Sequence, residues 1–312
     1  MRRRLSKALR FLAEVAGEDG KLPALGDDDN GNALSVFWDS HAGPGRTSRL
    51  RVTFPHTGYT ILRSRLQSQQ QIGFDHGSLG LAPMHAHGHA DALSVTWRTK
   101  DRDLLIDPGT FTYTGDPEWR HYFRSTRAHN TVTVDGRDQS TQRGPFIWQP
   151  TYSAMLKTLP ANGLSVLLGS HDGYRSMDVH HWRGLIYNHE DRLIVWDYIT
   201  GADSHDISLW WHFGVPVELQ GDVVIGANDG LAMHIAGAST ITLSRGLRQP
   251  ATGWRSSTYG QKEPTPALEA RQYGKLPISL TTLIALGDGS APVVTEAEAR
   301  WIAELRRCVD GR

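Results

Sequence analysis

Three histidines stand at alternate positions in one short segment, Met-His-Ala-His-Gly-His-Ala-Asp, which covers residues 84–91. Alternate side chains of an extended strand share one face, so the pattern predicts that His85, His87 and His89 line one side of a strand. A row of imidazoles packs a core poorly, but it suits a site that binds a metal ion or transfers a proton. A functional site therefore explains this segment better than coincidence does.

Asp107 and His129 add two further ligands to this group. Asp107 lies in an Ile-Asp-Pro-Gly turn and His129 in Ala-His-Asn-Thr. A hairpin of strands 92–98 and 104–106 would bring Asp107 back beside the histidines, and His129 opens the next alternating strand. Imidazole and carboxylate ligands suit zinc, and three of them would leave a position for water. His87 is either one of the ligands or a charged, proton-transferring group beside the ion.

Basic and aromatic residues gather just before His129, in Trp-Arg-His-Tyr-Phe-Arg-Ser-Thr-Arg (119–127). Arginine suits bidentate recognition of carboxylates, and tyrosine can donate or accept a proton. We therefore expect Tyr122, Arg124 and Arg127 to contact an acidic substrate. A solvated basic loop is an equally good interpretation of each of these positions.

Strands must position most of these residues. From about residue 51 onward short alternating or apolar runs are separated by turn signals, with strands expected at 59–63, 93–98, 130–134, 193–197, 207–213 and 279–285. No βαβ alternation appears, so we expect a mainly β fold, an antiparallel β-sandwich of stacked sheets. The tail, 295–307, is either a short helix or an irregular end.

The N-terminal part differs from the rest. Apolar residues at helical spacing predict one amphipathic helix over 4–16, which needs a partner to cover its apolar stripe. A polar turn follows it. Its aspartate run, 27–29, lacks the spacing and the distal glutamate of an EF-hand, so we expect a solvated loop rather than a calcium site.

Composition excludes several classes of protein. The chain has 312 residues, 39% of them hydrophobic and 21% charged, and a formal net charge of zero, which fits a soluble globular protein. Without a surplus of Lys and Arg, nucleic acid is not expected as a partner. No apolar run approaches the roughly 20 residues that span a bilayer, and no apolar stretch after the basic start indicates a signal peptide. A single cysteine, Cys308, excludes an internal disulfide.

Three motifs follow one another in a fixed order: His-Gly-His-Ala-Asp-Ala-Leu-Ser (87–94), Leu-Ile-Asp-Pro-Gly-Thr-Phe-Thr-Tyr (105–113) and Tyr-Phe-Arg-Ser-Thr-Arg-Ala-His-Asn-Thr-Val-Thr-Val-Asp-Gly-Arg-Asp-Gln-Ser (122–140). Two flanking segments accompany them, Leu-Pro-Ala-Leu-Gly-Asp (22–27) and Phe-Pro-His-Thr-Gly-Tyr (54–59). Together these segments resemble the heparinase II/III-like polysaccharide lyases.

The resemblance implies a fold and a site. Such lyases have an α/α toroid followed by antiparallel β-sheets, with a structural zinc whose ligands here would be His89, Asp107 and His129. The remaining histidine, His87, would face the substrate groove as a catalytic group. We therefore expect residues 1–26 to be the last helix and linker of a toroid that this chain mostly lacks, and residues 27–312 to be the β-sandwich domain.

The resemblance also implies an activity, the cleavage of an acidic, uronate-containing polysaccharide, such as a glycosaminoglycan or alginate, by β-elimination in the periplasm or cell envelope. The tyrosine acid/base and the carboxylate-neutralising residue of these lyases come mainly from the toroid, and no position here matches them. We therefore expect the chain alone to be weakly active or inactive, with a separately encoded toroid as a possible partner. The alternatives are a non-catalytic, zinc-stabilised carbohydrate-binding module and a hydrolase that uses zinc-bound water.

Overall fold

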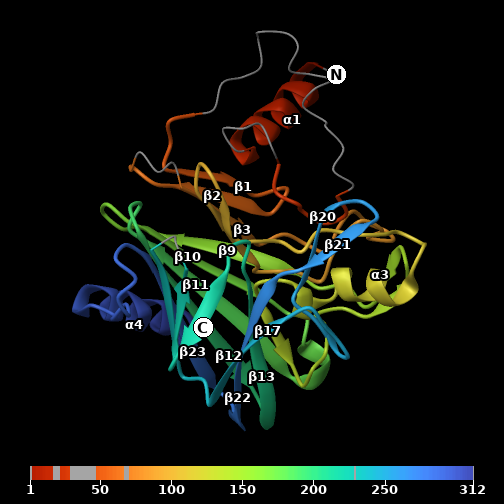
Figure 1. Cartoon of the computed structure of the whole chain (residues 1–312). Helices are drawn as coiled ribbons and strands as arrows, with labels where there is room; N and C mark the ends of the chain where they lie inside the picture. The colour runs from red at the N-terminus through yellow and green to blue at the C-terminus, as the bar shows by residue number, and fades with distance from the viewer. Residues whose placement is uncertain (1, 17–21, 29–46, 67–69, 228–229, 312) are drawn as a thin grey trace.

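Antiparallel strands make up most of the chain, as the alternating patterns predict (Figure 1). The computed structural model describes residues 2–16, 22–28, 47–66, 70–227 and 230–311. Within these ranges the three larger sheets have five, eight and four strands. Their strand pairings are antiparallel. The predicted mainly β fold of stacked antiparallel sheets is therefore confirmed.

The five-stranded sheet has the order β1 (Arg51–Phe54), β2 (Tyr59–Arg63), β3 (Gln71–Asp75), β4 (Val95–Arg98), β5 (Asp103–Leu105). The eight-stranded sheet has the order β14 (Val217–Gln220), β15 (Val223–Gly226), β16 (Leu231–Ala236), β23 (Ile278–Leu286), β12 (Arg192–Gly201), β11 (Val179–Tyr187), β10 (Ser165–His171), β9 (Ala154–Leu159). The four-stranded sheet has the order β17 (Thr240–Arg245), β22 (Pro266–Lys275), β13 (Ser204–His212), β6 (Val132–Val134).

Short hairpins and helices surround these sheets. Three two-stranded sheets pair β7 (Gln142–Gly144) with β8 (Ile147–Trp148), β18 (Leu247–Arg248) with β19 (Ala251–Thr252), and β20 (Trp254–Thr258) with β21 (Gln261–Pro264). The described α-helices are α1 (Arg2–Val15), α3 (Pro117–Arg124) and α4 (Glu296–Asp310), and two 3₁₀ turns are η1 (Thr126–Ala128) and η2 (Arg175–Met177).

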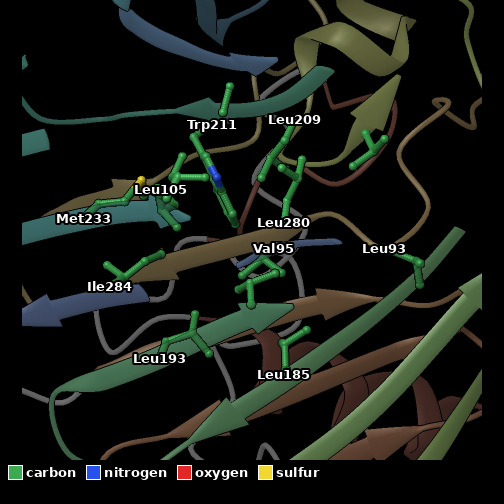
Figure 2. Packing of buried hydrophobic residues seen from close by; sticks show 14 of the residues in the cluster. Leu93, Val95, Leu105, Leu185, Leu193, Leu209, Trp211, Met233, Leu280 and Ile284 are labelled. Carbon is green, nitrogen blue, oxygen red and sulfur yellow. The ribbon is translucent and has the colours of Figure 1, made fainter. Parts of the chain in front are cut away.

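One hydrophobic core joins the three larger sheets. Val95 of β4, Leu193 of β12 and Leu209 of β13 are fully buried in the same cluster, which Figure 2 shows from close by. Trp211 of β13 lies in this core as well, with its indole Nε1 donating to the hydroxyl of Thr282 at 3.3 Å. Shared burial of apolar side chains from three sheets is what holds the stack together.

The N-terminal helix α1 packs against the five-stranded sheet, as the helix pattern requires (Figure 1). Phe11 meets Phe54 of β1 edge to face, with ring centroids 5.0 Å apart. Glu14 is fully buried and forms an ion pair with Arg63 of β2 at 2.6 Å. The predicted helix therefore exists, and its apolar stripe has a partner within this chain.

The C-terminal helix α4 packs on the eight-stranded sheet, so the tail is helical rather than irregular. Thr295 and Glu298 form a reciprocal capping box at its start. Leu305 packs so closely on β11 that a Cβ atom at Gly184 would lie 2.5 Å from its Cδ1 atom, so any larger residue at this strand position would require the leucine side chain to move. Among the described helices, none combines the length and apolarity needed to cross a membrane.

Candidate metal centre and the exposed histidine beside it

The segment with three histidines is a loop, so the predicted strand at residues 85–89 is wrong. Residues 82–87 form turns, and His85 has a φ of 57°. A Cβ atom at Gly88 would lie 2.8 Å from the backbone nitrogen of Gly80, which shows how tightly the loop closes on itself. His87 and His89 nevertheless share one partner, because each places a ring nitrogen within hydrogen-bond distance of the Asp27 carboxylate.

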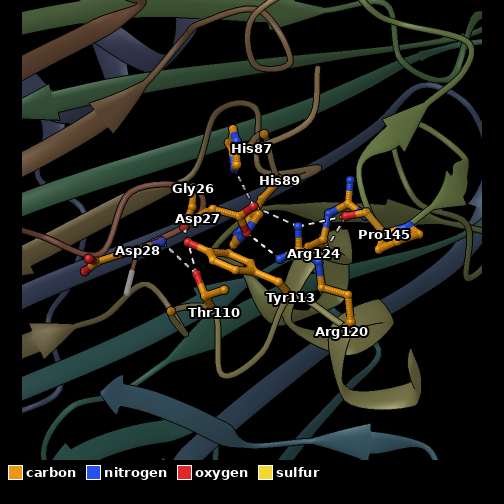
Figure 3. Close-up of polar contacts among 12 residues, drawn as sticks. Gly26, Asp27, Asp28, His87, His89, Thr110, Tyr113, Arg120, Arg124 and Pro145 are labelled. Atoms are coloured by element: carbon orange, nitrogen blue, oxygen red, sulfur yellow. Dashed lines mark hydrogen bonds and ion pairs between the residues drawn. The ribbon is translucent and has the colours of Figure 1, made fainter. Parts of the chain in front are cut away.

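The side chain of Asp27 is buried, so the expected solvated loop is wrong at this position. Its side chain is 0% exposed and receives the guanidinium of Arg120 on both oxygens, with a distance of 2.7 Å from Nη2 to Oδ2. His87 Nδ1 lies 3.1 Å from Oδ2, and His89 Nε2 lies 3.1 Å from Oδ1 (Figure 3). Burial raises the pKa of Asp27, but hydrogen bonds from His89 and Arg120 outweigh it and hold the pKa well below its ordinary value.

Backbone contacts fix Asp27 at this place. Its own N–H donates to the carbonyl of His87 at 3.0 Å, and the N–H of Asp28 donates to the hydroxyl of Thr110 at 2.8 Å. Gly26 has a φ of 60°, and a Cβ atom there would lie 2.8 Å from the His87 carbonyl oxygen. Only glycine tolerates both conditions. The third aspartate of the run, Asp29, lies outside the described residues.

His89 and His129 face each other with two unprotonated nitrogens. His89 Nε2 donates to ionised Asp27, and His129 Nδ1 donates to the carbonyl of Ser125 at 2.8 Å. The other nitrogens, His89 Nδ1 and His129 Nε2, are 3.2 Å apart. Burial lowers the pKa of both rings, so both are neutral near pH 7. Two lone pairs at this distance repel unless a cation lies between them, and two ligands of one tetrahedral ion have about this separation.

Carboxylates complete the donor set. His89, Asp91 and His129 each offer a ligand atom, and these atoms lie within 4.8 Å of one another, so this buried group could hold a metal ion. Asp107, which the sequence predicts as the acidic ligand, places its Oδ2 atom 3.7 Å from His129 Nε2. The structure thus brings the three predicted ligands into one neighbourhood and adds Asp91, which the predicted set omits.

Buried acids crowd around this position. Burial raises the pKa of Asp91 and of Asp107 well above the ordinary value, and the negative charge of Asp75 raises both further. The pKa of Asp75 itself is raised to about 6, mainly by burial. A bound cation would favour the ionised forms of these acids, because its charge offsets their mutual repulsion. The raised pKa values of the buried acids and the two facing imidazole nitrogens therefore both favour a bound cation.

The predicted hairpin is what brings Asp107 to His129. β4 and β5 pair through Trp97 and Leu105, and residues 106 and 107 continue toward the site. Asn130, next to His129, is fully buried and donates to the carbonyls of Val95 at 2.8 Å and Ile106 at 2.9 Å. One side-chain amide thus ties the loop of His129 to both arms of the hairpin.

Helix α3 carries two of the three predicted substrate-binding residues, and the alternative of a solvated loop is wrong for these two. Tyr122 and Arg124 are buried. Burial raises the pKa of Tyr122 to about 12 and lowers that of Arg124 to about 10. Arg124 donates to the Gly144 carbonyl at 2.9 Å and lies over the Trp148 ring at 4.4 Å.

Arg127 is half-buried beyond the end of α3, where its Nη2 lies 3.4 Å from the hydroxyl of Thr252. Its guanidinium lies 5.1 Å from the centre of the Trp210 ring. Contact of Tyr122, Arg124 and Arg127 with a substrate stays a prediction.

His87 differs from its neighbours because it is open to solvent. Its side chain is 70% exposed, and rings of Phe146 and Tyr113 lie 6.0 Å and 6.3 Å away. Tyr259, from the turn between β20 and β21, contacts Tyr113 at 5.2 Å. Since Nδ1 of His87 is held by Asp27, its Nε2 atom is the one available to a molecule from solution.

Comparison with known proteins assigns the chain to a family. Residues 46–299 match the family model described as Heparinase II/III-like, C-terminal. Because this match covers most of the 312 residues, the chain belongs to the heparinase II/III-like family.

Individual relatives can be named as well. A heparin-sulfate lyase of Pedobacter heparinus is 25% identical over 132 residues, which are 41% of this chain and 18% of that protein. Among solved structures, a heparinase III gene product superposes with a TM-score of 0.73 at 16% identity, over 92% of this chain and 47% of that one. The heparan sulfate lyase of Pedobacter heparinus gives a TM-score of 0.68 at 19% identity, over 91% and 47%. The chain thus spans about half the length of these structures, and the likeness to them establishes the fold.

Proposed function

We propose that this chain is the β part of a polysaccharide lyase that cleaves an acidic, uronate-containing polysaccharide by β-elimination. The observation that carries the proposal is His87, an exposed imidazole that a buried carboxylate holds in place. It lies directly beside the buried group of histidines and acids that could hold a metal ion. Membership of a lyase-containing family supports it. Heparan-type glycosaminoglycans are the first substrates to test, and alginate is the second.

The reaction needs three groups around the uronate. Its C5 proton is weakly acidic, so elimination requires neutralisation of the adjacent carboxylate, a base for the proton and an acid for the leaving oxygen. In this proposal His87 presents its Nε2 atom to the substrate as a proton-transferring or charged group, while Asp27 keeps the ring in place. A helical part, in the same protein or a separate chain, supplies the remaining groups.

We propose zinc as the metal, held by His89, His129 and Asp107, with Asp91 beside them. When bound, zinc would cross-link the loops that carry these ligands. His89 is 1% exposed and His129 0%, so a substrate has little access to an ion between them. This burial favours a structural role over hydrolysis by zinc-bound water.

Product formation tests the lyase proposal directly. The purified chain, alone and mixed with a helical domain from a full-length relative, is incubated with heparan sulfate, heparosan or alginate, and the absorbance of the unsaturated product is followed. We expect little product from the chain alone and clear product from the mixture, which His87→Ala abolishes and the control His234→Ala, on β16, leaves unchanged. Robust turnover by the chain alone would contradict the need for a second part, and a saturated product would contradict β-elimination.

A non-catalytic, zinc-stabilised carbohydrate-binding module is the second candidate. The observation in its favour is that the metal-binding group is buried, so an ion held there would stabilise the fold whether or not a reaction takes place nearby. It predicts binding of acidic oligosaccharides without product, even when a helical domain is present. For either function we propose the periplasm or cell envelope as the location, which fractionation of the source cells with an antibody to this chain tests.

A further inference from the structure

We propose that Asp27 is a positioning residue that fixes two histidines at once, His89 for the metal ion and His87 for the substrate. This inference rests on the proposed function. Asp27 lies outside residues 46–299, the part of the chain that matches the family model. Its role is therefore inferred from the contacts of this structure alone.

The first role concerns the metal ligand. A metal-binding imidazole must offer a lone pair, and the hydrogen bond of its other nitrogen decides which nitrogen that is. Asp27 Oδ1 accepts from His89 Nε2 at 3.1 Å, so the proton is on Nε2 and the lone pair is on Nδ1. That lone pair points at His129 Nε2, 3.2 Å away. Asp27 thus selects the tautomer of His89 that can bind the ion.

The second role concerns the exposed ring. Asp27 Oδ2 accepts from His87 Nδ1 at 3.1 Å, so the neutral form of His87 is the tautomer with its proton on Nδ1 and its lone pair on Nε2, toward solvent. Free histidine in water favours the opposite tautomer, with the proton on Nε2. The carboxylate therefore keeps His87 ready to accept a proton or a hydrogen bond, although the ring is 70% exposed and has few other contacts to hold it.

Arg120 fixes the carboxylate that performs both tasks. Its two terminal nitrogens bind the two oxygens of Asp27, which prevents the carboxylate from rotating. Its Nε and Nη2 also donate to the carbonyl of Pro145, at 3.1 Å and 2.9 Å. Phe146, the next residue, contacts the His87 ring. One planar ion pair thus sets the positions of the metal ligand, the exposed histidine and its aromatic neighbour, as Figure 3 shows for most of these groups.

Metal affinity tests the first role. Zinc is titrated into the full chain in competition with a chromophoric chelator, for the wild type and Asp27→Asn. Loss of such a hydrogen-bond partner typically weakens metal binding about 10- to 100-fold, and we expect a loss in this range. Glu14→Gln is the matched control, because Glu14 is also a buried carboxylate paired with an arginine near the N-terminus; its affinity should stay within about twofold of wild type. Equal affinity of Asp27→Asn and wild type would overturn this role.

Measuring the tautomer of His87 tests the second role, and this measurement requires no metal ion. Long-range ¹H–¹⁵N spectra of the imidazoles distinguish the two tautomers at about pH 8.5, roughly two units above the ordinary histidine pKa. We expect the Nδ1–H form of His87 in the wild type and in Glu14→Gln, and mainly the Nε2–H form in Asp27→Asn. An Nε2–H form already present in the wild type would overturn the proposal.

A second variant covers the case in which Asp27→Asn does not fold, since it leaves Arg120 as a buried charge without its partner. Asp27→Asn with Arg120→Gln removes both charges together and should show the same weaker metal binding and the same change of tautomer. Failure of the proposed function looks different: the wild type then forms no unsaturated product with any helical partner, while the effects of Asp27 on His89 and His87 persist.

Discussion

Two aspartates with buried side chains each bind one arginine and a buried histidine, yet only one of the two groups offers a donor set for a metal ion. The site cluster consists of Asp27, Arg120, His89 and His129. The sheet cluster consists of Asp197, Arg183, His181 and His171, and it joins β10, β11 and β12. In each cluster two imidazole nitrogens lie 3.1 to 3.2 Å apart. The difference lies in where their protons are.

In the sheet cluster the protons form a complete chain. The N–H of Gly173 donates to His171 Nδ1 at 3.1 Å, so the proton of that ring is on Nε2 and is donated to His181 Nδ1. The proton of His181 is on Nε2 and goes to Asp197 at 2.7 Å. Every ring nitrogen has a partner of the right kind, so no cation is needed.

In the site cluster the outer nitrogens of both rings are donors, so the inner ones both lack a proton. A close pair of neutral histidines can therefore bind a metal ion between its inner nitrogens only when the outer nitrogen of each ring donates its proton to an acceptor. That rule separates the two pairs, although distance and burial do not.

Loss of Asp197 should give the largest change in stability. Asp197→Asn leaves Arg183 buried beside a neutral partner, and breaking such a pair typically lowers the free energy of unfolding by about 3–5 kcal/mol. Zinc affinity should stay within a fewfold of wild type. Urea unfolding and zinc titration measure the two quantities, with Asp222→Asn, an exposed partner of His234, as the control. A loss below about 1 kcal/mol would show that the sheet cluster is not a cooperative unit.

Loss of His89 should abolish the response to metal. At a free zinc concentration 100 times the Kd, binding stabilises the folded wild type by about 2.7 kcal/mol, and His89→Ala should lose this gain together with bound zinc. His181→Gln, in the sheet cluster, should keep both. Metal content by elemental analysis and unfolding with and without a chelator check this prediction. A His89→Ala protein that still binds one equivalent of zinc with unchanged stability would remove His89 from the ligand set.

Lowering the pH should destabilise the protein through the sheet cluster, whether or not a metal ion is bound. Burial, followed by the positive charge of neighbouring histidines, holds the pKa of His171 well below its ordinary value. The folded ring stays neutral while the unfolded one binds a proton below about pH 6.5, so stability is lost as pH falls through that value. Below it, His171→Gln should show a slope shallower by roughly 1.4 kcal/mol per pH unit. Identical slopes in chelator-treated wild type and variant would contradict the assignment.

Substitution of His87 should change stability least. The ring is largely exposed, so His87→Gln should shift the free energy of unfolding by no more than about 0.5 kcal/mol and leave zinc binding intact. Lyase activity with a helical partner should nevertheless fall steeply. A variant with normal activity would show that His87 only lies near the substrate.

The strands and the order of the motifs could be predicted because they depend on local patterns. Residues 59–63 form β2 as predicted, and the hairpin that returns Asp107 is present. The strand predicted for the histidine segment failed because alternation alone cannot detect a loop that closes on Gly80 and Gly88. Alternation still singled out His87 and His89, and the structure places both at one carboxylate, that of Asp27.

The partners of the site were harder to predict because they are distant in sequence. Asp27 is 62 residues from His89 and 93 from Arg120, and its neighbours suggested a solvated turn. The only signal was the Gly-Asp pair of the 22–27 motif. Asp91 stood in the histidine motif itself, but a motif does not show which of two acids lies nearer the imidazoles. Burial of Arg124 likewise follows from tertiary packing on Trp148, which no local pattern reveals.

The contact between Asp27 and Arg120 has a practical consequence for anyone who cuts or recombines this protein. A recombinant fragment that starts at residue 46, where the family match begins, would lack Asp27, the counter-ion of the Arg120 guanidinium that is 2% exposed in the intact chain. Such a fragment should express poorly and bind zinc weakly even though every zinc ligand is still encoded. Chimeras with other helical domains should therefore be joined upstream of residue 22.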